Sequence, residues 1–150
     1  MLRTKTALLI DDEQGFLEPL ADGLEFDGIR VLKARTAEEA LKLLEKEQID
    51  LVTIDIMLDP GDTLGAHVDS HSTGLFLCHE IRKKYPQLDA FCISVVSDLG
   101  VIREIESLGI RFLRKGETPV RKVLSMLRSR LTGIAYSTQR DEMGRDRDRS

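Results

Sequence analysis

Short apolar runs alternate with amphipathic segments along most of the chain, and this alternation constrains the fold more than any other feature. The runs occupy residues 7–10, 29–34, 49–56, 90–96 and 110–113. Most positions in them are apolar and the pattern does not alternate strictly, unlike a strand that has one solvated face. Continuous runs are typical of parallel strands covered by helices on both sides. Right-handed crossovers between such strands then predict a doubly wound α/β fold.

The segments between the runs carry the signals of helices. Thr36 and Glu39 have the spacing of a capping box, in which side chains bond backbone N–H groups reciprocally. Thr118 is predicted to cap the last helix, with Pro119 at its first position and Gly133 after its end. Strand and helix therefore follow one another as repeated βα units.

Length and composition indicate one domain followed by a polar tail. The 150 residues are 41% hydrophobic, which is enough for a single core. We expect the domain to span residues 1–132, and the mixed-charge segment 133–150 to be flexible. Cys78 and Cys92 stand in apolar surroundings without metal-site spacing, so we expect two core thiols in a reducing compartment.

Charge and hydropathy argue against two classes of partner. Lys and Arg number 22 and Asp and Glu 26, and the net charge of −4 argues against direct nucleic-acid binding. The first residues lack the apolar stretch of a signal peptide, and no run approaches the roughly 20 apolar residues that span a bilayer. We therefore expect a cytoplasmic protein that does not contact membranes.

Polar residues stand at the ends of four of the predicted strands. They are Asp11 and Asp12 after the first strand, Asp55 on the third, Ser94 on the fourth and Lys115 on the fifth. The carboxyl ends of parallel strands meet at one edge, where ligands bind in this fold. Carboxylates from two strands suit Mg²⁺, whose charge offsets their repulsion. A lysine and a serine beside them suit a phosphoryl group, with Asp55 as a candidate nucleophile.

These residues resemble the receiver domain of two-component response regulators over about residues 7–131. The likeness rests on LLIDDE, on TIDIML around Asp55, on ISVV around Ser94 and on RFLRK ending at Lys115. It implies a flavodoxin-like parallel sheet with strand order 2-1-3-4-5. With no output domain visible in the sequence, we expect the stand-alone type, enlarged by the loop after the third strand.

The resemblance implies a phosphoacceptor site that uses Mg²⁺. Asp55 would receive a phosphoryl group from a histidine kinase or a histidine phosphotransfer protein. Asp12 would be the main metal ligand, joined by Asp11, Asp55 and the backbone carbonyl of Met57. The domain would take part in its own phosphoryl transfer without being an enzyme in the usual sense.

The resemblance also implies how the signal leaves the domain. Lys115 and Ser94 would hold phosphoryl oxygens, and Ser94 and Phe112 would form a switch. Output would be contact with an unidentified downstream protein, with homodimerisation through the last helix–strand–helix face as a further option. Ser97 is a rival hydroxyl to Ser94, although it is also placed to cap the following helix.

Several positions depart from the pattern of the family. Gly116 stands where a proline usually follows the lysine, and Val95 replaces a small residue after the switch hydroxyl. Met57 and Val96 occupy two positions that tune attack by water on the phosphoaspartate. Because both are apolar and orient water poorly, we expect slow self-dephosphorylation.

Other readings remain open at this point. A degenerate receiver that serves as a phosphorylation-independent interaction module is favoured by Val95 and Gly116. A phosphohydrolase on the same fold is less favoured, since Met57 stands where such an enzyme has a second acid. The long connection between residues 58 and 73 is a candidate lid or recognition loop. Its His67, Asp69 and His71 also allow a second metal site.

Overall fold

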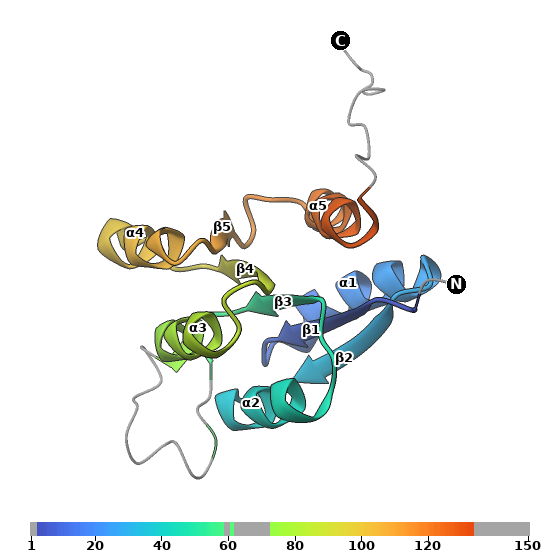
Figure 1. Ribbon diagram of the computed structural model, residues 1–150. Helices are drawn as coiled ribbons and strands as arrows, with labels where there is room; N and C mark the ends of the chain where they lie inside the picture. The colour runs from blue at the N-terminus through green and yellow to red at the C-terminus, as the bar shows by residue number, and fades with distance from the viewer. Residues whose placement is uncertain (1–2, 59–60, 62–72, 134–150) are drawn as a thin grey trace.

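A parallel sheet forms the centre of the computed structural model, which describes residues 3–58, 61 and 73–133. Its strand order is β2-β1-β3-β4-β5, as predicted, and the described strands pair in parallel (Figure 1). The strands are β1 (Thr6–Ile10), β2 (Arg30–Ala34), β3 (Leu51–Ile54), β4 (Asp89–Ser94) and β5 (Arg111–Arg114). The predicted fold class is therefore confirmed.

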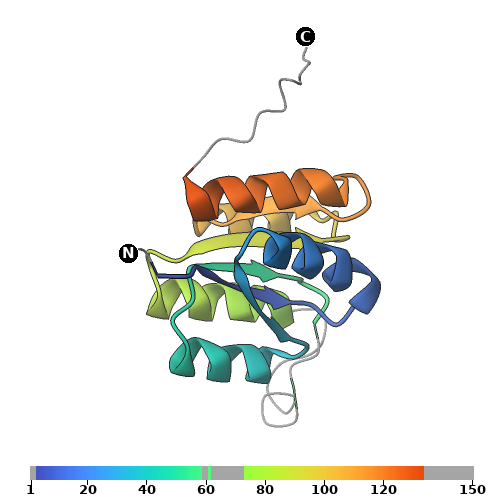
Figure 2. The ribbon, with the colours of Figure 1, turned by 90° about the vertical axis from the view of Figure 1, so that its right-hand side faces the viewer.

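Helices cover both faces of the sheet. One face carries α1 (Gln14–Phe26) and α5 (Val120–Thr132). The other carries α2 (Ala37–Lys46), α3 (Thr73–Lys84) and α4 (Leu99–Ser107), and Figure 2 shows the layers from a second direction. Two parts of the sequence prediction lie outside the described residues, namely the tail and most of the long connection with His67, Asp69 and His71.

Strand β1 shows why the apolar runs are continuous. Leu8 and Ile10 belong to the core beneath α2, α3 and α4, whereas Ala7 and Leu9 belong to the core beneath α1 and α5. All four side chains are buried. A strand that faces two cores has no solvated side, so the four consecutive residues from Ala7 to Ile10 are all apolar. Cys78 and Cys92 are both buried, as expected of core thiols.

The helix ends follow the sequence signals with small shifts. Thr36 Oγ1 accepts a hydrogen bond from the Glu39 N–H at 3.1 Å, but the Glu39 carboxylate bonds the N–H of Arg35 at 2.7 Å. The predicted Thr118 cap is wrong, since α5 begins at Val120 with Pro119 as its N-cap. The Thr118 N–H instead closes the preceding turn. Gly133 ends α5 with φ +76°, as predicted.

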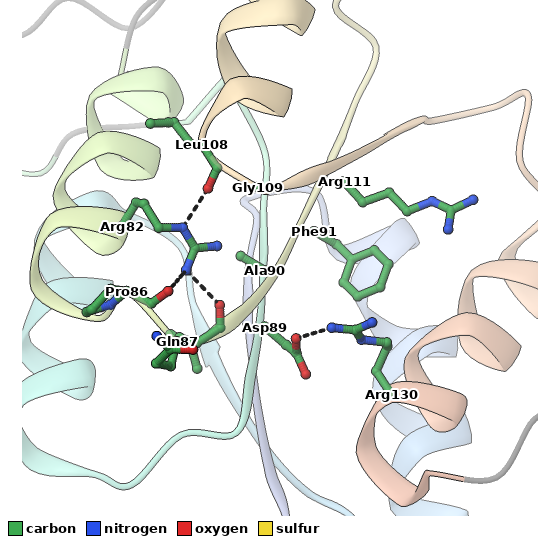
Figure 3. Close-up of a pocket in the computed structure, with 11 residues that line it drawn as sticks. Arg82, Pro86, Gln87, Asp89, Ala90, Phe91, Leu108, Gly109, Arg111 and Arg130 are labelled. Atoms are coloured by element: carbon green, nitrogen blue, oxygen red, sulfur yellow. Dashed lines mark hydrogen bonds and ion pairs between the residues drawn. The ribbon is translucent and has the colours of Figure 1, made fainter.

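Arg82 links the ends of α3 and α4 at the pole of the molecule opposite the carboxyl ends of the strands. Its guanidinium donates hydrogen bonds to the carbonyls of Leu108 at 2.7 Å and Pro86 at 2.9 Å (Figure 3). It also donates to the carbonyls of Tyr85 at 3.2 Å and Leu88 at 3.0 Å. These carbonyls lie where α3 and α4 end and their loops begin. Arg82 also borders a cavity of about 340 Å³, together with Pro86, Leu88 and Leu108. Arg82 therefore satisfies acceptors that the helices leave unpaired.

Replacing Arg82 with lysine tests this role. Lysine keeps the charge but presents a point donor that cannot satisfy a fan of carbonyls. We expect Arg82→Lys to lower the free energy of unfolding by about 2 kcal/mol, measured by urea denaturation. The neighbouring exposed Lys83→Arg is the matched control, and equal stability of the two variants would contradict this role.

Candidate functional site

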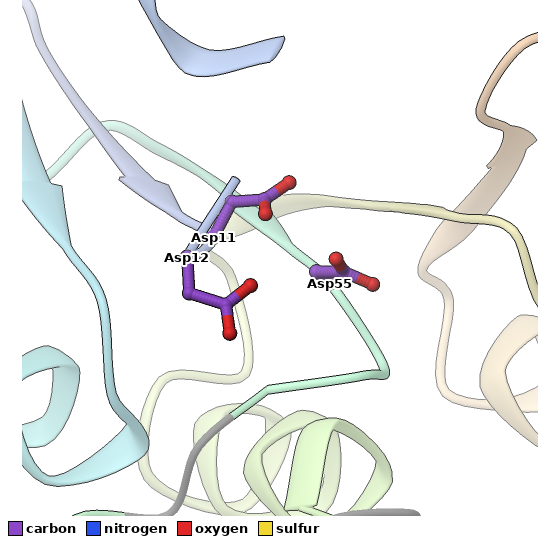
Figure 4. A group of neighbouring side chains, drawn as sticks. All are labelled: Asp11, Asp12 and Asp55. Atoms are coloured by element: carbon purple, nitrogen blue, oxygen red, sulfur yellow. The ribbon is translucent and has the colours of Figure 1, made fainter. Parts of the chain in front are cut away.

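Asp11, Asp12 and Asp55, here called the acid cluster, meet at the carboxyl ends of β1 and β3. One ligand atom from each lies within 4.8 Å of the others, as predicted from their strand positions (Figure 4). Asp11 and Asp55 are 3% and 5% exposed, whereas Asp12 is exposed to solvent. Two buried carboxylates beside an open third form a hard-oxygen site with access from one side.

Backbone hydrogen bonds orient the two buried carboxylates. The N–H of Glu13 donates to Asp11 Oδ1 at 2.8 Å, and the N–H of Met57 donates to Asp55 Oδ1 at 3.1 Å. The Asp55 N–H bonds the Ile10 carbonyl at 3.1 Å, which extends the β1–β3 pairing to the acid cluster. Each carboxylate is thus fixed through one oxygen and presents the other to the site.

Lys115 presents its ammonium to those remaining oxygens. Its Nζ lies 2.8 Å from Asp11 Oδ2, 3.0 Å from Asp55 Oδ2 and 2.9 Å from Glu13 Oε1. It also lies 4.9 Å from the centroid of the Phe16 ring, within cation–π range. The lysine side chain is only 7% exposed. The structure thus brings Lys115 together with the acids, as the sequence predicted, whereas its role stays a prediction.

Burial and charge set the protonation of this group. Burial raises the pKa of Asp11 to about 6, and the neighbouring Asp55 charge also raises it. Hydrogen bonds from Lys115 and the Glu13 N–H, and the charge of Lys115, lower the pKa but do not outweigh burial. Burial alone would lower the pKa of Lys115, but its hydrogen bonds to Asp11, Glu13 and Asp55 outweigh burial and raise the pKa. The lysine therefore stays charged. One ammonium among several carboxylates leaves negative charge for a divalent cation to balance.

Ser94 adjoins this group, whereas Phe112 does not contact it in the described structure. Ser94 is fully buried at the end of β4, and its carbonyl accepts the Lys115 N–H at 2.9 Å. Phe112 lies on β5 and packs, half-buried, against the core beneath α2, α3 and α4. Ser97 is exposed and does not cap α4, because Asp98 accepts the first N–H groups of that helix.

The departures from the usual pattern lie at the rim of the site. Val95 is 63% exposed and borders, with Lys115, a cavity of about 460 Å³ beside the acid cluster. Gly116 adopts φ +87°, a conformation that proline cannot reach. The loop after Lys115 thus has a left-handed glycine conformation where the family usually has a proline.

The sequence prediction missed Gly74, which lies against the backbone beside Asp55. A Cβ at Gly74 would come within 2.2 Å of Ile56 Cα and 2.4 Å of the Asp55 carbonyl oxygen. The Gly74 N–H also bonds the Ile56 carbonyl at 3.1 Å. This close approach sets the position of the chain that carries Asp55. A single glycine near a helix start gives no sequence signal of such contact.

Comparison with known proteins agrees with this arrangement. A sequence model of the response regulator receiver domain matches residues 7–123. The chain belongs to the response regulator receiver domain family. It is thus a signalling domain of two-component systems, whose members generally bind Mg²⁺ at an acidic pocket. Among the described residues, no helix is long and apolar enough to span a membrane.

Two curated relatives are longer than this chain. The transcriptional activator protein ExaE of Pseudomonas putida is 33% identical over 137 residues, which cover 88% of this chain and 58% of ExaE. The regulatory protein VanR of Enterococcus faecium is 36% identical over 78 residues, which cover 52% of this chain and 29% of VanR. The matched regions therefore span little more than half of ExaE and less than a third of VanR.

Solved structures share the fold over most of this receiver domain. A CheY-like receiver domain protein from Methanospirillum hungatei superposes with a TM-score of 0.73 at 24% identity, covering 87% of this chain and 96% of that one. The receiver domain of an HD domain-containing protein from Pseudomonas fluorescens gives 0.71 at 26% identity, covering 87% and 97%.

A methyl group at Gly74 tests whether its close approach positions the site. We expect Gly74→Ala to lower the free energy of unfolding by about 1–3 kcal/mol, because the added atom meets backbone that has little room to move. Gly15→Ala is the control, since a Cβ there meets no described atom within 4 Å. Chemical denaturation of both variants gives the comparison, and a Gly74 variant as stable as the Gly15 variant would exclude the contact.

Proposed function

We propose that this receiver domain accepts a phosphoryl group on Asp55 from the phosphohistidine of a histidine kinase or histidine phosphotransfer protein. A carboxylate oxygen of Asp55 attacks phosphorus, the phosphorus–nitrogen bond breaks, and the electron pair leaves with the imidazole. The observation that carries the proposal is the Lys115 ammonium, 3.0 Å from Asp55 Oδ2 at the edge of the acid cluster. A fixed positive charge there faces the oxygens of the incoming phosphoryl group.

The donor set supports a magnesium site in the acid cluster. Asp11 and Asp12, with one Asp55 oxygen and the backbone carbonyl of Met57, would hold the ion. Magnesium supplies positive charge that offsets the charge of the transferring group. Asp11 and Asp55 are buried and already oriented by backbone N–H groups, so little reorganisation is required of them.

Ser94 and Phe112 are the proposed switch. The buried Ser94 hydroxyl would bond a phosphoryl oxygen, and Phe112 on the neighbouring strand would follow that movement. The output surface would then be α4, β5 and α5, read by a downstream protein or by a second copy of the chain. We take residues 1–132 as the receiver unit.

The degenerate-receiver alternative draws little support from the two departures. Val95 is turned to the rim, and Gly116 leaves the Lys115 ammonium in contact with Asp55. Neither residue removes a group that phosphoryl transfer needs. The geometry therefore favours a working phosphoacceptor.

Intact-mass measurement after treatment with acetyl phosphate and Mg²⁺ tests the proposal. We expect the protein to gain one phosphoryl group, and Asp55→Asn or removal of Mg²⁺ with a chelator to abolish the gain. Asp89→Asn is the control, because Asp89 pairs with Arg130 at the opposite pole. Unchanged labelling of the Asp55 variant would refute the proposal.

The lifetime of the phosphoaspartate follows from its apolar neighbours. Met57 is 39% exposed beside Asp55 and offers water no strong hydrogen-bonding group. We expect slow loss of the label, and a Met57→Gln variant to lose it about tenfold faster, less than a full general base would give. The decay of the phosphorylated mass over time measures both rates. Rapid loss from the wild-type protein would contradict this expectation.

A further inference from the structure

Lys115 is held by more than the two buried aspartates. A lysine ammonium has three protons, and here three carboxylate oxygens accept them at 2.8, 2.9 and 3.0 Å. Among the described residues, Asp11 and Asp55 belong to the acid cluster, and Glu13 does not. A cation bound at the acid cluster would compete with the lysine for the negative charge of Asp11 and Asp55. Glu13 lies outside the acid cluster, so its contact with the lysine would not face that competition.

The geometry of α1 directs Glu13 towards the lysine. Glu13 is the N-cap of this helix, yet its side chain caps no N–H group within the described structure. Its carboxylate instead contacts Lys115, the residue directly after β5. Phe16 follows one turn later, and its N–H bonds the Glu13 carbonyl at 3.1 Å, which closes the turn. One turn of α1 thus supplies a carboxylate and an aromatic face to the same ammonium.

The backbone next to Lys115 provides little side-chain packing that would hold its ammonium in place without the Glu13 contact. The Lys115 N–H is anchored on the Ser94 carbonyl, but Gly116 follows at once with φ +87°, and a Cβ there would meet no described atom within 4 Å. This loop side is therefore open. The lysine stem is buried, but Gly116 adds no side chain that packs against it, so the contacts of the ammonium help to set where its charge points.

We propose that Glu13, supported by the Phe16 ring, is a positioning residue that keeps the Lys115 ammonium directed at Asp55 when the acid cluster is occupied. This inference rests on the proposed phosphoacceptor function, which it deepens. Glu13 does not touch the reacting atoms. It acts through the lysine, from the wall of the cavity of about 460 Å³ that both residues border.

The first experiment compares rates of phosphorylation by acetyl phosphate with Mg²⁺ at saturating concentration. We expect Glu13→Gln to lower the rate about three- to fivefold, the size of effect of one exposed ion pair. Glu18→Gln is the matched control, since Glu18 lies on the same helix, is also 61% exposed and faces Lys33. A Glu13 variant that is labelled as fast as the wild type overturns the inference.

The second experiment reads the lysine directly and does not require phosphorylation. In ¹⁵N-detected NMR of lysine ammonium groups with Mg²⁺ present, we expect a slowly exchanging Lys115 signal in the wild type and in Glu18→Gln. Glu13→Gln and Phe16→Leu should both speed its exchange, with unchanged magnesium affinity by calorimetry. Identical exchange in all four proteins overturns the inference.

The two outcomes separate this inference from the proposed function. A wild-type protein that takes no label refutes the phosphoacceptor proposal, while the NMR comparison still tests the role of Glu13. A wild-type protein that is labelled, with a Glu13 variant that matches it in either experiment, refutes only the role of Glu13.

Discussion

Two buried carboxylates side by side impose the main constraint on this molecule. Asp11 and Asp55 leave adjacent strands, and burial together with the nearby Asp55 charge raises the pKa of Asp11, so a compensating charge is needed there. Lys115, the residue directly after β5, provides that charge across the intervening β4. Removing one partner from such a buried set leaves an uncompensated charge, which is strongly destabilising. The site therefore depends on a strand order that brings Lys115 within reach of both Asp11 and Asp55.

The rest of the fold keeps the ends of these strands in place. Strand β1 is buried on both sides, so its terminus has little freedom to move. At the other pole, Arg82 satisfies the carbonyls at the ends of α3 and α4. Gly74 brings α3 against the chain beside Asp55. Close packing elsewhere thus holds the carboxylates together at one edge of the sheet despite their repulsion, as is expected of a preorganised site.

The sequence predicted those parts of the structure that depend on local patterns and on general rules of topology. Continuous apolar runs indicated parallel strands, and the polar residues after them met at one edge because parallel strands share a direction. The roles of Asp55 and Lys115 were inferred from residue types at the strand ends and from the family resemblance, and they remain proposals. Gly74 and the Glu13 contact were missed because each depends on which backbone or side chain a distant element brings near. The cap of α5 was misplaced by one residue, since Thr118 and Pro119 both suit a helix start.

Gly116 shows how this receiver domain replaces one kind of constraint with another. A proline after the lysine would fix the loop through its ring, whereas φ +87° requires glycine and gives the loop more freedom. The position of the ammonium then depends on charge contacts of two kinds. Those to Asp11 and Asp55 are buried and weakly screened by salt, whereas Glu13 is 61% exposed and its contribution falls as ionic strength rises. How precisely the Lys115 ammonium is positioned therefore depends more on its charge contacts than on the backbone that carries it.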